Sequence, residues 1–413
     1  MLFEEYPHFD MQMKPKTPKL RLLSYMIALP TVMKHKPKMT KVNMKGIKPP
    51  YILLGNHNAF LDIQMLSVIT FPHLMNYVIA IDGFLNRENF LRHIGGICKR
   101  KFTTDTTLIK HIEYVIKKKH ILAMFPEARY SLCGTTAILP KSLARLCKHL
   151  DVPVVTLMMK GHHINNPFWN LTDRKIKGIE AELKCLITKE ELEMMSVDEI
   201  DERIQHEFIY DEYAWQLKKK IPVKYEGRAE GLHKVLYKCP HCLTEYRMSS
   251  KGTILKCEAC GKEWEYSIYG ELMAKDGITE FSHIPSWYEW ERDEVRKEVE
   301  AGTYHFEDEV HIDMLPKDKF IPLGKGHLTH DLTGFTLKGE HNGKPFEVKL
   351  PASKTYGVHI EYEYLGKYGD CVDLNTLDNT YYVYPEGKNF AVTKFSLATE
   401  EIYKMLMKKH DLE

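Results

Sequence analysis

The sequence predicts an α/β domain followed by a four-cysteine module and a small β-rich domain that ends in a helix. Between residues 51 and 159, short apolar runs alternate with longer runs at helical spacing, which is typical of a sheet with interleaved helices. Two Cys-x2-Cys pairs follow between residues 239 and 260, and beyond residue 268 several runs alternate as strands do. A chain of 413 residues is too long for one ordinary core. We therefore expect domains at residues 1–225, 226–268 and 269–413.

The α/β domain shows its elements through hydrophobic periodicity. Apolar residues recur at helical spacing from Leu108 to Ile116, after a cap at Thr104 or Asp105, and again from Leu143 to Leu150. A charged helical stretch covers residues 197–220. The predicted strands are residues 51–55, 77–81, 97–102, 121–125 and 152–158.

The N-terminal segment is locally basic although the whole chain carries a formal charge of only +2. The near-neutral total argues against nucleic acid as a partner, and none is expected. An apolar stretch between Pro18 and Pro30 suits an interfacial anchor on anionic lipid, with a disordered basic tail or a core helix as alternatives. No acidic residue separates Asp10 from Asp62, and the basic residues between them are Lys14, Lys16, Lys19, Arg21, Lys34, Lys36, Lys38, Lys41, Lys45 and Lys48.

The expected location is cytoplasmic, peripheral on the inner face of the cell membrane. No run reaches the ~18 to 20 apolar residues that a spanning helix needs, and the N-terminus lacks the layout of a signal peptide. Of the nine cysteines, four form one tight set and five are scattered, which does not resemble a secreted disulfide framework.

The string Gly55-Asn56-His57-Asn58-Ala59-Phe60-Leu61-Asp62 follows an apolar strand and precedes a periodic run. His57 should therefore lie at the carboxyl end of a strand, where open α/β sheets place their ligands. A histidine can take a proton from an alcohol, while a carboxylate on its other ring nitrogen fixes the tautomer. The spacing alone is weak evidence, because His206 and Asp211 repeat it inside a predicted helix. We interpret that second pair as a surface coincidence.

Three further blocks accompany this motif. Phe125-Pro126-Glu127-Ala128-Arg129-Tyr130-Ser131 follows another apolar strand, and Val152-Pro153-Val154-Val155 comes after it. Between the His57 motif and Glu127 lies Gly95-Gly96-Ile97-Cys98-Lys99-Arg100-Lys101, a basic cluster suited to binding a phosphate. The alternative for each of these basic residues is a solvated strand end.

This ordered set resembles the bacterial lysophosphatidate (1-acylglycerol-3-phosphate) acyltransferase family over roughly residues 20–190. The resemblance implies a glycerolipid acyltransferase-like α/β sheet, with His57 as general base and Asp62 orienting it. It further implies that Arg100 and Glu127 bind the acceptor's glycerol phosphate. The remaining substrate-binding candidates beside these motifs are Arg129, Asn56 and Lys99.

The implied function is phospholipid biosynthesis: transfer of a fatty acyl chain from acyl-CoA or acyl carrier protein to lysophosphatidate, giving phosphatidate. Two departures bear on the acceptor. Tyr130 stands where the family usually has Arg, with Arg129 one place early, and Thr156 replaces a usual Pro. A different lysophospholipid or alcohol acceptor is therefore one alternative. A catalytically inactive scaffold at the membrane is another.

Cys239-Pro240-His241-Cys242 and Cys257-Glu258-Ala259-Cys260 have near-standard zinc-ribbon spacing. Four thiolates at this spacing predict a structural zinc ion with no open catalytic position. The rest of the chain predicts a β barrel or sandwich capped by a helix, similar in outline to a pleckstrin-homology-like module, with a plain interaction domain as the alternative. Its predicted elements are strands 334–339, 346–350, 358–364, 381–384 and 390–395, and a final helix 400–409.

Overall fold

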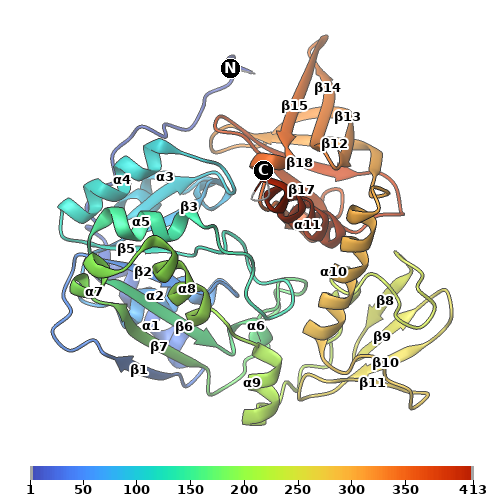
Figure 1. Ribbon diagram of the computed structural model, residues 1–413, viewed down its shortest axis with the longest axis horizontal. Coiled ribbons are helices and arrows are strands. Elements are labelled where there is room, and N and C mark those ends of the chain that lie inside the picture. The colour runs from blue at the N-terminus through green and yellow to red at the C-terminus, as the bar shows by residue number, and fades with distance from the viewer. Residues whose placement is uncertain (1–2, 411–413) are drawn as a thin grey trace. The chain divides into compact units, whose positions relative to one another are not determined.

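The computed structural model describes residues 3–410 and divides into two compact units (Figure 1). The α/β unit comprises residues 10–99 and 105–223. The C-terminal unit comprises the described residues of 1–9, 100–104 and 224–413. The two units meet along the chain between Val223 and Lys224, and the expected domain boundaries at 225 and 268 stay predictions.

The α/β unit is built on a seven-stranded mixed sheet with the strand order β1-β7-β6-β2-β5-β3-β4. Only β6 and β7 are antiparallel; the other neighbouring strands run parallel. The strands are β1 (Lys38–Val42), β2 (Tyr51–Gly55), β3 (Met75–Ala80), β4 (Gly96–Lys99), β5 (Ile121–Met124), β6 (Val154–Lys160) and β7 (Glu180–Ile187). The helices are α1 (Arg21–Met33), α2 (Leu61–Ile69), η1 (Ile81–Phe84), α3 (Glu88–His93), α4 (Thr106–Lys117), α5 (Ser142–Leu150), α6 (His162–Asn165), α7 (Lys189–Met194), α8 (Val197–Glu207) and α9 (Glu212–Lys219).

The five predicted strands of this unit and the helices α4 and α5 are present, with boundaries that shift by up to three residues. Asp105 caps α4, because its side chain accepts a hydrogen bond from the backbone N–H of Thr107. Ile52 and Leu54 of β2 belong to one apolar cluster with residues of α4, α5 and α8. These helices therefore bury one face of the central strand and keep it rigid.

Strands β1 and β7 of this sheet were not predicted, and α1 is longer than expected. The edge strand β1 has no buried residue, and β7 alternates between charged or half-exposed residues and buried ones because one of its faces is solvated. Helix α1 continues through Pro30 to Met33. Pro30 lies inside this helix, where its ring nitrogen cannot donate the usual hydrogen bond to the carbonyl four residues earlier.

Helix α1 is fixed to α2 by one buried arginine. Arg21 is 5% exposed and donates to the carbonyl of His73, to the hydroxyl and carbonyl of Ser67, and to the hydroxyl of Thr70. Within residues 3–410, no helix combines the length and apolar character needed to cross a membrane.

The C-terminal unit contains two antiparallel sheets (Figure 1). The four-stranded sheet has the order β11-β10-β9-β8, and the seven-stranded sheet has the order β15-β14-β13-β12-β18-β17-β16. Its elements are η2 (Leu232–Lys234), β8 (Met248–Lys251), β9 (Ile254–Cys257), β10 (Glu263–Tyr266), β11 (Leu272–Ala274), α10 (Ile284–Glu300), β12 (Phe306–Leu315), β13 (Ile321–Asp331), β14 (Gly334–His341), β15 (Lys344–Pro351), η3 (Ala352–Lys354), β16 (His359–Glu361), η4 (Tyr364–Gly366), β17 (Cys371–Asn375), β18 (Thr380–Pro385) and α11 (Val392–His410).

The final helix corrects the sequence prediction for residues 390–395. Residues 390–395 were expected to form a strand, but α11 already begins at Val392. Phe395, Leu397, Ala398 and Ile402 are all buried, and this spacing is helical. The final helix is therefore longer than the predicted 400–409, and the pleckstrin-homology-like outline stays a prediction.

Candidate active site

Strand β2 places Asn56 and His57 at the carboxyl edge of its sheet. All five residues of β2 are buried between the parallel neighbours β5 and β6. The Asn56 amide is fully buried: Nδ2 donates to the carbonyl of Met159 at 2.8 Å and Oδ1 accepts from the Met159 N–H at 2.7 Å. Asn56 thus ties β2 to β6. We assign it a structural role in place of the predicted substrate contact.

His57 and Asp62 are in direct contact, as their motif predicts. Asp62 lies in the first turn of α2 and is fully buried. Its Oδ2 lies 3.0 Å from His57 Nδ1 and accepts the backbone N–H groups of Asn58 at 2.6 Å and Ala59 at 2.9 Å. An ionised carboxylate only accepts, so Nδ1 carries the proton and Nε2 of His57 has the lone pair that a general base needs. The His57 side chain is 15% exposed.

A second histidine, which the sequence analysis missed, binds the other oxygen of Asp62. His162 Nδ1 lies 2.6 Å from Asp62 Oδ1, and the His162 side chain is fully buried. It is the first residue of α6, directly after β6 and Gly161, whose φ of 92° suits glycine. Asp62 therefore lies between two imidazoles.

Asp62 stays ionised in this environment. Burial raises its pKa, but the hydrogen bonds from His162 and His57 outweigh that effect and lower the pKa to about 2. A folded-state pKa below the unfolded value stabilises the fold at neutral pH, and this contribution disappears as the pH falls through about 2. The carboxylate is thus a fixed negative charge at any pH at which the protein works.

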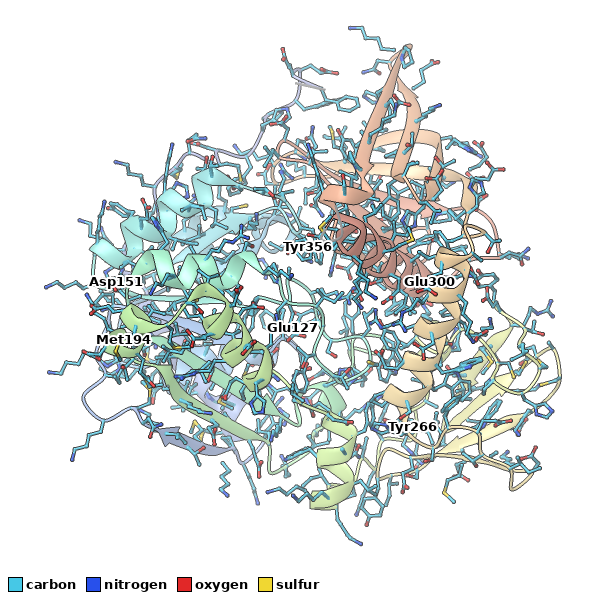
Figure 2. The ribbon with its side chains drawn as sticks, viewed as in Figure 1. Glu127, Asp151, Met194, Tyr266, Glu300 and Tyr356 are labelled. Carbon is cyan, nitrogen blue, oxygen red and sulfur yellow. The ribbon has the colours of Figure 1, made fainter. Side chains whose placement is uncertain are left out.

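Glu127, labelled in Figure 2, supports the backbone of the motif instead of facing outward. It is 1% exposed; Oε1 accepts the N–H of His57 at 2.9 Å and Oε2 accepts the N–H of Ala137 at 2.8 Å. Burial raises the pKa of Glu127 to about 8, against those two hydrogen bonds and the positive charge of Arg129, which lower it. Its visible role is to hold the His57 backbone in place.

Two aromatic rings fix the plane of the His57 imidazole. Phe125 stacks on it with ring centroids 4.0 Å apart and an interplanar angle of 11°. Tyr130 lies 4.3 Å away at 45°. Phe60, between His57 and Asp62 in the chain, is 62% exposed. The histidine therefore lies where a buried polar cluster reaches an apolar surface.

Arg129 and Lys99 occupy different places relative to His57. Arg129 is 4% exposed and close enough to lower the pKa of Glu127 by its charge. Lys99 ends β4, which is three strands from β2 in the sheet order. At ~4.8 Å per strand this separation is about 14 Å. Burial lowers the Lys99 pKa to about 8. Arg129, but not Lys99, shares the surroundings of the His57–Asp62 pair.

Arg100 belongs to the C-terminal unit, where its guanidinium is held by protein acceptors, and its predicted role in phosphate binding stays a prediction. The side chain is 2% exposed. Nη1 donates to the carbonyl of Leu315 at 3.0 Å and to the hydroxyl of Thr380 at 2.9 Å, and Nη2 donates to the carbonyl of Pro316 at 2.9 Å. A guanidinium held by three protein acceptors is a structural clamp for the strand ends β12 and β18.

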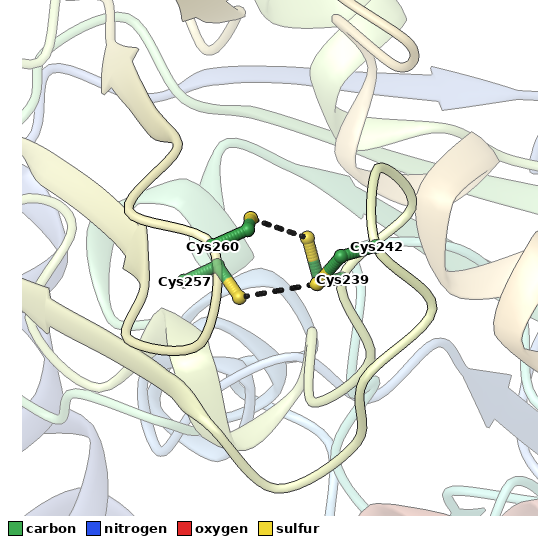
Figure 3. Close-up of side chains that lie close together, drawn as sticks. All are labelled: Cys239, Cys242, Cys257 and Cys260. Atoms are coloured by element: carbon green, nitrogen blue, oxygen red, sulfur yellow. Dashed lines mark hydrogen bonds between the residues drawn. The ribbon is translucent and has the colours of Figure 1, made fainter.

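The four predicted cysteine ligands do converge (Figure 3). Cys239 Sγ lies 3.9 Å from Cys260 Sγ, and Cys242 Sγ lies 3.7 Å from Cys257 Sγ. All four sulfur atoms lie within 4.8 Å of one another. Four thiolates around one ion at ~2.3 Å lie about 3.8 Å apart, so this cluster has the size of a tetrahedral metal site.

Three comparisons with known proteins found similar acyltransferases. A model of the Acyltransferase family matches residues 32–160. This part of the chain is acyltransferase-like. The 1-acyl-sn-glycerol-3-phosphate acyltransferase of Saccharomyces cerevisiae is 32% identical over 123 residues, which are 27% of this chain and 39% of that protein. The chain thus spans well under half the length of this relative. The 1-acyl-sn-glycerophosphate (LPA) acyltransferase PlsC from Thermotoga maritima gives a TM-score of 0.36 at 14% identity, over 46% of this chain and 78% of that one.

The acyltransferase-like segment contains His57, Asp62, Glu127 and Arg129, and it ends at Lys160, two residues before His162. One observation could have revealed His162. The string Gly161-His162-His163 directly follows an apolar strand, as His57 does. Knowing that β6 is the parallel neighbour of β2 would have placed both histidines at one sheet edge.

Replacing His162 by alanine should weaken the catalytic pair without abolishing it. The change removes a 2.6 Å bond to a buried carboxylate, so we expect about 1 to 3 kcal/mol of lost stability. We also expect kcat to fall on the order of tenfold with KM unchanged, because ~1.4 kcal/mol of transition-state stabilisation is a factor of ten. Denaturant unfolding and steady-state kinetics measure the two effects.

His163→Ala is the matched control for this experiment. His163 is equally buried and adjacent in the chain, but its Nε2 lies 3.5 Å from the Tyr213 hydroxyl. The His163→Ala variant should be less stable than wild type, but its folded molecules should keep the wild-type kcat. An equal fall in kcat for both variants would contradict a specific role for His162.

Arg100→Gln should destabilise the fold and leave acceptor binding intact. Buried acceptors at Leu315, Pro316 and Thr380 would lose their donor, at a cost of about 1 to 3 kcal/mol. Exposed Arg145 provides the control, and Arg145→Gln should change stability by less than about 0.5 kcal/mol. A large rise in KM for lysophosphatidate with unchanged stability would support the phosphate-binding role of Arg100.

Proposed function

We propose that the protein transfers a fatty acyl chain from the thioester of acyl-CoA or an acyl carrier protein to the free hydroxyl of lysophosphatidate, giving phosphatidate. The observation that carries this proposal is the contact between His57 Nδ1 and the buried, ionised Asp62. It leaves Nε2 of a partly exposed imidazole as a proton acceptor. The acyltransferase family match over residues 32–160 supports the same reaction class.

The proposed chemistry needs no covalent enzyme intermediate. His57 Nε2 takes the proton of the acceptor hydroxyl as its oxygen attacks the thioester carbonyl carbon. The tetrahedral intermediate then breaks its C–S bond, and the imidazolium returns the proton to the departing thiolate. Ester and free thiol are the products. Asp62 stays ionised throughout and stabilises the imidazolium, and His162 holds Asp62 in position.

Arg129 is our candidate for the acceptor's phosphate, since it is the predicted cation that lies close to Glu127 and thus to His57. A second acceptor class is favoured by one observation. The Arg100 guanidinium donates to Leu315, Pro316 and Thr380, so one of the predicted phosphate ligands is already engaged. A different lysophospholipid or a non-phosphorylated alcohol is therefore the alternative acceptor. The intact His57–Asp62–His162 arrangement favours an enzyme over an inactive scaffold.

Helix α1 supports attachment to the inner face of a membrane. Four apolar side chains of this helix are exposed: Leu22 57%, Leu23 38%, Met26 52% and Ile27 57%. The neighbouring lysines are mostly exposed as well, which favours anionic lipid. Because Arg21 fixes α1 to α2, a membrane contact through α1 would hold the helix that carries Asp62 near the lipid substrate.

We assign zinc to the four-cysteine cluster as a structural ion. Four thiolates at tetrahedral spacing are the ligand set that zinc prefers, and they leave no open coordination position. The ion would lock the loop that carries Cys239 and Cys242 to strand β9 with Cys257.

The proposed reaction is tested by His57→Ala together with His206→Ala. Loss of the base should lower turnover by ~10² to 10⁴ or more. His206 stands five residues before Asp211 in the same spacing, but it is exposed and Asp211 caps α9 instead. The His206 variant should keep full activity. Mass spectrometry of the lipids formed from a panel of lysolipids, with both donor types, measures turnover and identifies the acceptor. Near-normal turnover by His57→Ala would end the proposal.

The membrane assignment predicts that the double change Met26→Glu and Ile27→Glu weakens vesicle binding. Both side chains are about half exposed, so the helix should still fold. Binding to vesicles that contain phosphatidylglycerol should fall at least about tenfold, since burying one such side chain is worth about 1.5 to 3 kcal/mol. Met194, 80% exposed on α7, gives the control Met194→Glu. Equal sedimentation with neutral and anionic vesicles would count against the assignment.

A further inference from the structure

A second group of metal-ligating side chains lies on the seven-stranded sheet of the C-terminal unit. His359 of β16 pairs with Asp373 of β17, and Glu361 pairs with Cys371. Opposed residues of an antiparallel pair point to the same face, as do residues two apart in a strand. His359, Glu361, Cys371 and Asp373 therefore share one face of this strand pair.

The distances between these groups match those between ligands of one ion. His359 Nε2 lies 2.9 Å from Glu361 Oε1 and 4.0 Å from Asp373 Oδ2. Ligand atoms of all three residues lie within 4.8 Å of one another. Nitrogen and oxygen ligands bind zinc at about 2.0 to 2.2 Å, so ligands of one ion are about 3 to 4 Å apart. The group thus needs only small adjustments to close around an ion.

Most of the group is buried, and only the Glu361 side chain, 14% exposed, reaches solvent, so negative charge here is costly. His359 and Asp373 are each 2% exposed. The Cys371 thiol is fully buried, 3.8 Å from Asp373 Oδ1. Two carboxylates beside one imidazole carry excess negative charge, and a carboxylate held in a low-dielectric interior is strongly destabilising unless a cation or hydrogen-bond donors compensate it.

An independent observation is the hydroxyl of Tyr384. This side chain is 1% exposed; among residues 3–410 its oxygen has no nitrogen or oxygen partner, and it interacts with the Cys371 thiol. Asp373 pairs with Tyr382 of β18, so Tyr384, two residues on, points to the same face as the group. A buried hydroxyl whose partner is a weakly bonding thiol, next to three ligand groups, has capacity left for a further polar ligand.

We propose that His359, Glu361 and Asp373 bind a divalent transition-metal ion, zinc by preference, next to the Cys371 thiol and the Tyr384 hydroxyl. An imidazole with two carboxylates suits zinc better than magnesium or calcium, which prefer oxygen alone. The ion would tie the short edge strand β16 to β17. It is separate from the four-cysteine cluster, since no residue is shared.

The experiment compares the zinc content of full-length wild-type protein with that of His359→Ala. Both are expressed with zinc, passed over a chelating resin and analysed by mass spectrometry of the element against protein concentration. His359→Ala should contain one zinc ion per chain less than wild type. This difference does not depend on whether the four cysteines hold zinc. A failure of the four-cysteine assignment can therefore be told apart from a failure of the His359 site.

The matched control is His327→Ala. His327 of β13 also bonds a glutamate, at 3.1 Å from Glu309, but it is 41% exposed, and among the described residues no third ligand lies beside it. Its zinc content should equal that of wild type. Asp373→Asn keeps the size of the side chain and should lose the same ion. If His359→Ala does not fold, the zinc content of Asp373→Asn tests the proposed site. The proposal is overturned if a folded variant, either His359→Ala or Asp373→Asn, contains as much zinc as wild type.

Discussion

The buried carboxylate of Asp62 organises the acyltransferase-like unit. It accepts two backbone N–H groups from the turn before α2 and one imidazole on each of its two oxygens. These donors keep it ionised against the cost of burial. Three separate parts of the chain, the end of β2, the start of α2 and the start of α6, therefore meet at one negative charge. Removing that charge would release all three.

The part of this site that is local in sequence could be predicted, and the rest could not. His57 and Asp62 are five residues apart, and a tight strand-to-helix turn brings them together whatever the rest of the sheet does. His162 is 100 residues from Asp62 in the chain. Its place at the site depends on β6 lying beside β2, and strand order cannot be read from the periodicity of single strands.

The contacts of Arg100 could not be predicted from its motif either. The motif gives its position directly after β4, but a side chain's direction depends on which acceptors the fold brings near it. The carbonyls of Leu315 and Pro316 come more than two hundred residues later in the chain. Strands β12 and β13 were missed for a different reason. Acidic residues at the start of β12, and proline, glycine and lysine within β13, interrupt the apolar residues and weaken the strand signal.

The placement of His57 links the chemistry to the proposed membrane surface. Its imidazole has a buried partner, Asp62, on one side, and the neighbouring Phe60 is exposed in the turn between them. The helix that begins at this turn is fixed to α1 by Arg21, and α1 presents its own exposed apolar residues. A lysolipid needs its hydroxyl at a base while its acyl chain stays in an apolar phase. A rigid connection between Asp62 and the apolar face of α1 would satisfy both needs. The lipid head group could then reach His57 Nε2 while the acyl chain stays in the membrane.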